Sequence, residues 1–296
     1  MHSQKKSSQL HESQQQRGSN DHSNRSFQAI LQNHRPLVWV LILAITLIWG
    51  YGWVLMKSAL EYMGPFTFSS FRFGTGALTL FLLVWIRRLG LPHKRYWKHL
   101  VIIGIFQTTI VFLLVMFALK FVDAGKSSVL LYSMPMWCSL LAVKFLNEKL
   151  NPWKSAGLRI GMIGLLTILG WDVWLGQRSE VIFGELLIIL AAVSWAISNI
   201  YYRLKIKDLP EIQVSAFQMF FGAIGIFIVT IFMESGQPVI LNLHSLYYIL
   251  FTGVLASALC FTIWFIIMRT VDMVTATIST LLVPLFGLIF SSILLQ

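Results

Sequence analysis

Long apolar stretches follow one another from Leu37 to the last residues of the chain. Each is close to the roughly 20 residues that an α-helix needs to cross a hydrocarbon core of about 30 Å. Membrane β-barrels need strands of about ten residues with alternating polarity, and these stretches do not alternate, so the pattern predicts helices. Nine spans are predicted, with limits near 37–56, 66–86, 99–119, 127–146, 155–174, 184–202, 213–233, 245–267 and 275–295.

The segment 1–36 has a different character. It is rich in Ser, Gln, Asn and His and holds little that could be buried, which is typical of disordered segments. No apolar run precedes Pro36, so we do not expect the segment to be a secretory signal peptide. We expect a disordered cytoplasmic tail over residues 1–36.

Composition supports a membrane protein. Hydrophobic residues make up 56% of the chain and charged residues 12%, against about 25% charged in soluble proteins. The mean hydropathy of +0.72 excludes a water-soluble globular protein. The net charge of +11 comes from basic residues scattered between apolar segments, so no nucleic-acid partner is expected. Cys138 and Cys260 each lie inside an apolar run and predict neither a disulfide framework nor a zinc site.

The basic residues are distributed unequally across the nine predicted spans. Eighteen Lys and Arg residues fall on the side of the N-terminus and four on the opposite side, and Arg72 lies within a span. Because cytoplasmic loops carry the excess of Lys and Arg, we expect a cytoplasmic N-terminus. The expected location is the plasma membrane.

The chain also matches itself at two successive offsets. The two offsets divide the chain into a first repeat at 37–175 and a second repeat at 181–296. Each copy begins on a different side of the membrane, because five spans precede the second copy, so the repeats are expected to be inverted. This build is common among secondary transporters, whose substrate site lies between the halves. The aligned pairs are Trp49/Trp195, Lys57/Arg203, Phe71/Phe217, Gly76/Gly222 and Ala77/Ala223 at 146 residues, and Gly104/Gly253, Phe112/Phe261, Lys120/Arg269, Val122/Val271, Asp123/Asp272 and Pro135/Pro284 at 149 residues.

The second copy is shorter than the first. The offset of 149 maps Asn147 onto Gln296, so the counterpart of Glu148 and of the fifth helix would fall beyond residue 296. Either the protein is naturally short or the sequence is a truncated reading of a ten-span protein. We expect the truncated reading, with nine spans present and the last helix missing.

Four segments together resemble the EamA-type members of the drug/metabolite transporter superfamily. They are LIWGYGWVLMKSAL at 47–60, Pro65 with the Phe-Arg-Phe at 71–73, AGKSSVLLYSMPMWCSLLAVKFLNEKL at 124–150, and GELLIILAAVSWAISNIYYRL at 184–204. The resemblance covers about residues 37–296 and implies an all-α integral membrane fold of two inverted five-helix units. It also implies the movement of small metabolites, amino acids or drugs, usually outward.

Arg72 is the strongest candidate for substrate contact. It lies about seven residues into its predicted helix, where a charge costs about 2.5–3.5 kcal/mol on insertion scales, so it is expected to face a cavity or a partner. A carboxylate-bearing substrate would be its ligand. The alternative is that its long stem snorkels to the outer interface.

Further candidates for the substrate pathway lie at membrane depth, each with a packing alternative. Pro135 and Pro284 each remove a helix hydrogen bond and predict a hinge or cavity wall, or a kink that serves packing only. Trp49 and Trp195 could line a cavity or fill the core. Tyr132 and Asn199 could contact substrate or bond between helices. Glu148 is expected to pair with Lys144 or Lys149 at the cytoplasmic interface, with ion coupling as the alternative.

The sequence does not indicate an enzyme. All seven histidines lie in the tail, loops or span margins, and no nucleotide-binding glycine pattern precedes a helix. No cofactor and no metal are expected. The function predicted is secondary transport of small metabolites, amino-acid-like or drug-like, across the plasma membrane, with export by alternating access. Alternatives are a non-transporting receptor or assembly scaffold, and a lipid-modifying membrane enzyme. The expected partners are a small-molecule solute and the lipid bilayer, with a second copy of the chain as a further candidate.

Overall fold

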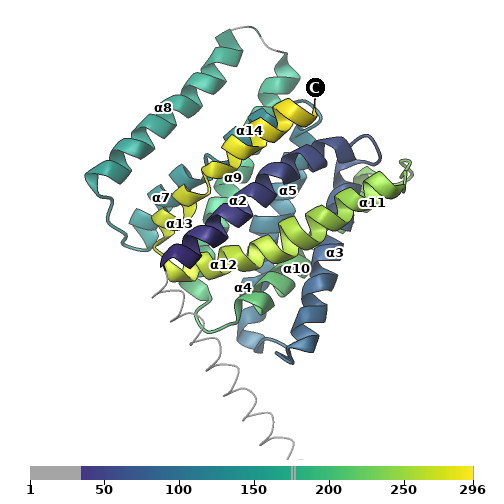
Figure 1. Cartoon of the computed structure of the whole chain (residues 1–296), viewed down its shortest axis with the longest axis horizontal. Helices are drawn as coiled ribbons and strands as arrows, with labels where there is room; N and C mark the ends of the chain where they lie inside the picture. Colours follow the sequence, from purple (N-terminus) through teal and green to yellow (C-terminus); the bar gives the residue numbers. More distant parts are fainter. Residues whose placement is uncertain (1–34, 175, 177, 296) are drawn as a thin grey trace, which may run out of the picture.

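The computed structural model describes residues 35–174, 176 and 178–295. Every regular element in this part of the chain is helical, which confirms the predicted all-α class (Figure 1). The predicted tail at 1–36 lies outside the described residues except for its last two positions, which begin the first helix. The helices are α2 (Arg35–Ala59), α3 (Pro65–Ile86), α4 (Lys94–Ile103), η1 (Gly104–Thr109), α5 (Ile110–Ala118), α6 (Ala124–Leu131), α7 (Met134–Phe145), α8 (Pro152–Trp174), α9 (Ser179–Lys205), α10 (Glu211–Met233), α11 (Leu243–Leu250), η2 (Phe251–Leu259), α12 (Cys260–Thr270), α13 (Met273–Ser279) and α14 (Leu282–Leu294).

Eight helical segments in the described part of the chain are long and apolar enough to cross a membrane. The protein is therefore a multi-pass membrane protein. Helix α8 occupies the place of the predicted fifth span but is not one of the eight. Its side chains from residue 168 onward lie outside the described part, so the count of nine stays a prediction. The eight segments are Pro36–Ala59, Pro65–Ile86, Lys94–Ala118, Ala124–Phe145, Ser179–Lys205, Glu211–Met233, Leu243–Thr270 and Met273–Leu294.

Two of these spans are interrupted at proline. Pro135 and Pro284 were expected inside continuous helices, but each lies in the first turn of a second helix, α7 or α14. The breaks fall between Leu131 and Met134 and between Ser279 and Leu282. Because proline lacks an N–H and is tolerated in a first turn, the chain satisfies it by starting a new helix there.

Two other spans contain a π-helical section, η1 and η2. Gly104 begins η1, and Gly253, which the 149-residue offset aligns with it, lies in η2. A Cβ on Gly104 would lie 2.4 Å from the carbonyl oxygen of Gln218, and a Cβ on Gly253 would lie 2.8 Å from that of Arg72. Glycine therefore allows η1 to approach α10, and η2 to approach α3, backbone to backbone.

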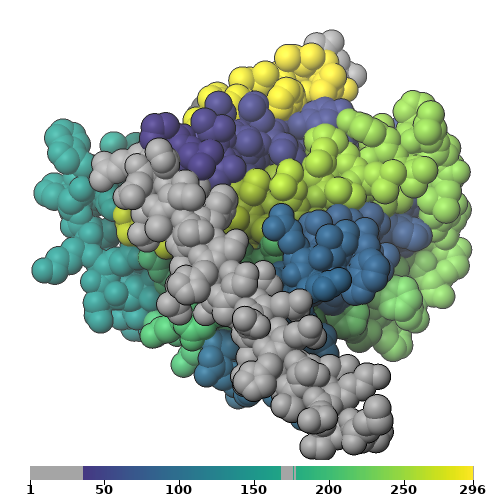
Figure 2. Space-filling view, turned by 60° about the horizontal axis from the view of Figure 1, so that its bottom comes forward, coloured from purple at the N-terminus to yellow at the C-terminus, as the bar shows by residue number. Residues whose placement is uncertain are grey.

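The helices pack in a central bundle, with one exception. Helix α3 packs along α10, α14 along α2, and α7 along α9. Helix α8 contacts α7 and α9 but extends along one side of the molecule, apart from the bundle (Figure 1). Its teal side chains project at the left edge of Figure 2. The buried core therefore lies within the other helices, where α2, α3, α9 and η2 meet.

Candidate functional site

A small pocket lies at the centre of the bundle. Its walls come from α2, α3, α5, α6, α9, η2 and α12, together with Tyr132 at the break after α6. The cavity volume is about 30 Å³, room for about one or two water molecules, so the pocket is in a contracted conformation. The lining residues are Trp49, Gly52, Trp53, Met56, Arg72, Phe112, Leu131, Tyr132, Trp195, Ala256 and Phe261.

Four of the predicted pathway residues line this pocket: Trp49, Arg72, Tyr132 and Trp195. They come from positions spread over almost 150 residues of sequence, and all four are at most 6% exposed. Long-range packing of α2, α3 and α9 with the α6–α7 break brings them together.

Arg72 is buried rather than extended to the membrane surface. Its side chain is 4% exposed, its Nε donates to Ser257 Oγ at 2.8 Å, and its Nη1 lies 2.8 Å from Met56 Sδ. The guanidinium carbon lies 4.6 Å from the ring centroid of Phe112 and 5.0 Å from that of Phe73. No carboxylate lies within ion-pair distance among the described residues. The snorkelling alternative is therefore wrong, and the pocket carries an uncompensated positive charge.

The two tryptophans pack against each other in the wall of the pocket. Their ring centroids lie 5.9 Å apart in an edge-to-face arrangement, a favourable geometry for aromatic rings. Trp49 Nε1 donates to the carbonyl oxygen of Ala256 at 2.8 Å. Trp195 Nε1 is buried and has no hydrogen-bond partner among the described residues. The Tyr132 ring lies edge-on to Trp195 with centroids 5.9 Å apart.

The structure does not bring the other predicted pathway residues to the pocket. Asn199 is buried, accepts from Trp264 Nε1 at 3.3 Å, and its Nδ2 lies 3.5 Å from Met134 Sδ. The Pro135 carbonyl accepts from Ser139 Oγ at 2.7 Å. Pro284 is half-buried in α14. Asn199 contributes contacts between helices and Pro135 a contact within one helix, and the place of all three residues in a pathway stays a prediction.

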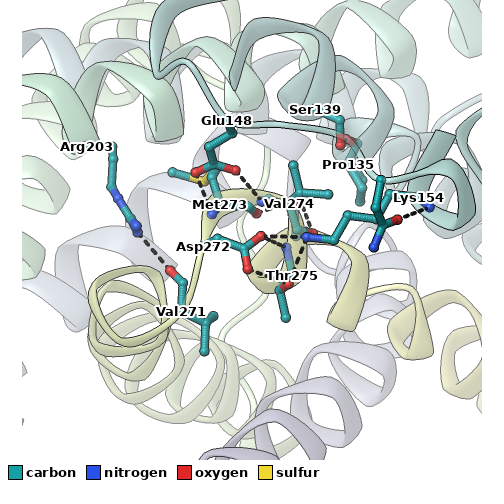
Figure 3. A network of polar contacts seen from close by, with 12 residues as sticks. Pro135, Ser139, Glu148, Lys154, Arg203, Val271, Asp272, Met273, Val274 and Thr275 are labelled. Atoms are coloured by element: carbon teal, nitrogen blue, oxygen red, sulfur yellow. Dashed lines mark hydrogen bonds and ion pairs between the residues drawn. The ribbon is translucent and has the colours of Figure 1, made fainter. Parts of the chain in front are cut away.

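Glu148 has a different partner from the one expected. Its carboxylate accepts from the backbone N–H groups of Met273 at 3.0 Å and Val274 at 3.3 Å, as Figure 3 shows. Among the described residues, neither Lys144 nor Lys149 lies within ion-pair distance of it. The first N–H groups of a helix have no partner within the helix, so the carboxylate caps α13 instead.

The same end of the molecule holds a second polar group, visible in Figure 3. Lys154 Nζ lies 3.0 Å from Asp272 Oδ2, and the Thr275 N–H and hydroxyl both donate to Asp272. Burial raises the pKa of Asp272, but the hydrogen bonds from Thr275 and Lys154 outweigh burial and lower this pKa below its usual value. The carboxylate therefore stays ionised at neutral pH.

An ion pair with a buried carboxylate and a partly exposed lysine joins the two halves of the chain. Lys126 in α6 pairs with Glu185 in α9, and Glu185 is fully buried. Sequence reasoning missed Glu185, although an acid inside a predicted span is itself a signal.

Sequence reasoning also missed several pocket walls. Phe112 and Phe261 stood in the repeat alignment as an aligned pair, and their rings lie 6.4 Å apart, so the alignment could have identified them. Met56 and Ser257, the two polar contacts of Arg72, carried no signal in the sequence.

Comparisons with known proteins agree with this architecture. The chain is 32% identical over 250 residues to the uncharacterized transporter YoaV of Bacillus subtilis, covering 84% of this chain and 85% of that protein. It is 25% identical over 251 residues to the protein PagO of Salmonella typhimurium, covering 84% and 82%. A solved structure titled "Crystal structure of protein" superimposes with a TM-score of 0.67 at 19% identity, covering 86% of this chain and 87% of that one.

A family profile matches the chain twice, and the two matches cover most of its length. The matched segments are residues 37–170 and 182–296, and the profile is that of the EamA-like transporter family. Pocket-lining residues occur in both segments, with Arg72 in the first and Trp195 in the second. The chain belongs to the EamA-like transporter family and has the role of a membrane transporter.

Proposed function

We propose that this protein is a secondary transporter that exports a small solute, amino-acid-like or drug-like, across the plasma membrane by alternating access. The central pocket carries the proposal. It holds a buried guanidinium without a counter-charge among the described residues, surrounded by aromatic rings, at a junction of both family-matched segments. A charge inside a membrane span is costly, and such charges usually mark a substrate or ion pathway. The binding sites of many secondary transporters lie between two such halves.

Contacts between aligned positions support the inverted duplication. Trp49 contacts Trp195, its counterpart at the 146-residue offset. Lys57 Nζ donates to the Val122 carbonyl oxygen at 3.3 Å, and Arg203 Nη1 donates to the Val271 carbonyl oxygen at 3.0 Å. The same basic-to-carbonyl contact thus recurs between aligned residues of the two copies. Two related halves around one pocket are the arrangement that many alternating-access transporters use.

The contracted pocket corresponds to one state of the cycle. A cavity of about 30 Å³ cannot hold a metabolite, so the halves must separate to admit one. At one end the Glu148 carboxylate holds α13, which belongs to the second half, to the segment after α7, which belongs to the first. We assign this contact to the closed cytoplasmic gate, and the excess of basic residues supports the cytoplasmic side.

Counterflow tests the proposed function. The purified chain is reconstituted into liposomes loaded with a panel of unlabelled amino acids, organic anions and cationic drugs, and entry of each labelled solute is followed. We expect labelled entry of at least one solute above protein-free liposomes, reduced at least tenfold by Arg72→Gln, because the substitution removes the charge of the pocket.

Two results would contradict the proposal. Absence of counterflow for every member of the panel favours a receptor or assembly scaffold. Unchanged counterflow in Arg72→Gln places the pathway elsewhere. The substitution Arg95→Gln is the matched control, because Arg95 lies at the surface near Asp208 and outside the central pocket.

A further inference from the structure

The central pocket has an unequal balance of hydrogen-bond donors and acceptors. Among its lining side chains are one guanidinium and three indoles, and no Asp or Glu. Arg72 uses two of its five N–H donors in the contacts to Ser257 and Met56. Sulfur is a weak acceptor, so the contact with Met56 does little to neutralise the charge. The pocket therefore offers hydrogen-bond donors and a positive charge, but its lining has no carboxylate that could accept these hydrogen bonds or neutralise this charge.

Trp195 supplies a second donor. Its Nε1 is buried and lacks a hydrogen-bond partner among the described residues, whereas the equivalent atom of Trp49 already donates to Ala256. Buried polar groups without a partner are rare in native proteins, and each needs an explanation. Because Trp195 lies in the wall of the pocket, a hydrogen-bond acceptor on a bound ligand would explain its unpaired N–H group.

We infer that the solute is an organic anion, whose charged group takes hydrogen bonds from both Arg72 and Trp195 Nε1, and that it carries no ammonium group. The remaining walls are mainly rings and aliphatic side chains, with the Tyr132 hydroxyl and the Trp53 indole N–H as further polar groups, so the body of the solute is mostly apolar. An ammonium group would lie near the Arg72 charge with no lining carboxylate to pair with, and the rings alone would have to stabilise it. The inference rests on the proposed function and selects one class among its candidate solutes.

A cation held by the aromatic rings is the main competing assignment. Clusters of Trp, Tyr and Phe do bind ammonium ligands through their ring faces. Here the faces of Phe112 and Phe73 already lie within 4.6 and 5.0 Å of the Arg72 guanidinium carbon. A second cation would meet the repulsion of the first in a water-poor site, which disfavours it.

Isosteric probes separate these classes. Benzoate, benzamide and benzamidine share one ring and nearly one shape and differ in charge from negative through neutral to positive. 3-Phenylpropanoate and L-phenylalanine differ by one ammonium group. Equilibrium binding of each labelled probe to the full chain in lipid nanodiscs measures affinity without interference from leakage of weak acids through a bilayer.

The anion assignment predicts a definite order of affinities. Benzoate should bind at least tenfold more tightly than benzamide, and benzamidine should bind more weakly than both. L-phenylalanine should bind at least tenfold more weakly than 3-phenylpropanoate. An equal or better affinity of benzamidine or L-phenylalanine overturns the assignment, and so does the absence of saturable binding for both carboxylates.

Variants test the two donors by the ratio of benzoate to benzamide affinity. Trp195→Phe keeps a ring but removes the N–H, and should lower this ratio about tenfold, the usual effect of losing one hydrogen bond to a charged group. Trp49→Phe is the matched control, because its N–H is already bonded to Ala256; it should change both affinities together and leave the ratio within about twofold. Arg72→Gln should bring the ratio near one, and Arg72→Lys, which keeps the charge, should restore part of it.

These outcomes distinguish the inference from the proposed function. Counterflow of a neutral or cationic solute together with a flat ratio across the variants leaves a transporter and removes the anion assignment. Tight benzoate binding that depends on both donors, without counterflow of any solute, keeps the anion site and removes the transport function. An unchanged ratio in Trp195→Phe refutes the second donor, even if Arg72→Gln abolishes the preference.

Discussion

Individual charged residues in this protein are buried where bulk water cannot solvate them, and burying a charge costs free energy unless it is paired. Arg72 lies among aromatic rings and has no acidic partner among the described residues. Glu185 lies fully buried as well, but it pairs with Lys126 across α6 and α9. Removing one member of a buried pair leaves a charge uncompensated, whereas replacing both by apolar groups is often neutral. The two buried sites therefore respond differently to substitution.

The Lys126–Glu185 pair provides the first stability prediction. Lys126→Met alone should lower the free energy of unfolding by about 3–5 kcal/mol, because the fully buried Glu185 carboxylate then loses the ammonium group that it pairs with. The double variant Glu185→Leu with Lys126→Met should recover most of that loss. Thermal unfolding in detergent micelles measures both. Equal destabilisation by the single and double variants would show that the ion pair is not the reason for the loss.

At the scale of helices, two kinds of contact hold neighbouring helices together: carboxylate caps at helix N-termini and close approaches at glycine. Glu148 caps α13, and Glu234 caps α3 in the same way, accepting from the N–H groups of Phe66 at 3.0 Å and Thr67 at 2.7 Å. In both cases a carboxylate from another part of the chain meets the partial positive charge of a helix N-terminus. Such cross-helix caps fix the relative positions of helices that are distant in sequence.

The glycine contacts between helices give the second stability prediction. Gly104→Ala should lower the free energy of unfolding by about 1–3 kcal/mol, because the new Cβ would lie 2.4 Å from the Gln218 carbonyl oxygen. Gly157→Ala in α8 is the matched control, since nothing lies within 4 Å of its Cβ position, and it should be neutral or slightly stabilising. Thermal unfolding compares the two. A loss of stability of the same size in both, or no loss in Gly104→Ala, would show that the close approach to Gln218 is not the cause.

For the whole molecule, the sequence predicted the helical class and four residues that line the pocket, but not the partners of its charged groups. Eight of the nine predicted spans coincide with helical segments that are long and apolar enough to cross a membrane, and a charge inside one of them singled out Arg72. The alignment of Trp49 with Trp195 indicated two structurally related residues, and these now lie in contact. Hydropathy predicts which residues lie away from water, and an internal repeat predicts which residues occupy related positions. Both can therefore be read from the sequence without a structure.

The partners of Glu148 and Arg72 were beyond the reach of the sequence for one physical reason. Glu148 was expected to pair with lysines one to four residues away, but it contacts backbone N–H groups 125 residues further along the chain. Ser257, which receives a hydrogen bond from Arg72, lies 185 residues away from it. Every residue has the same backbone N–H group, so the sequence does not show which one a side chain will contact. Contacts between residues so far apart in the chain are determined by tertiary packing.

Accessibility of the central pocket from the two sides of the membrane tests the central claim most directly. Ala256→Cys places a thiol in the pocket wall, in a background with Cys138 and Cys260 replaced by Ala. The measurement is the labelling rate with a membrane-impermeant thiol reagent, added to right-side-out and to inside-out vesicles. Ala196→Cys is the matched control, because Ala196 is fully buried but does not line the pocket.

Alternating access predicts labelling of Ala256→Cys from both sides, although slowly, since the contracted pocket must open before the reagent enters. The control should stay unlabelled from either side. Labelling of Ala256→Cys from one side only, or from neither side in a protein that still transports, would contradict a transport pathway through this pocket.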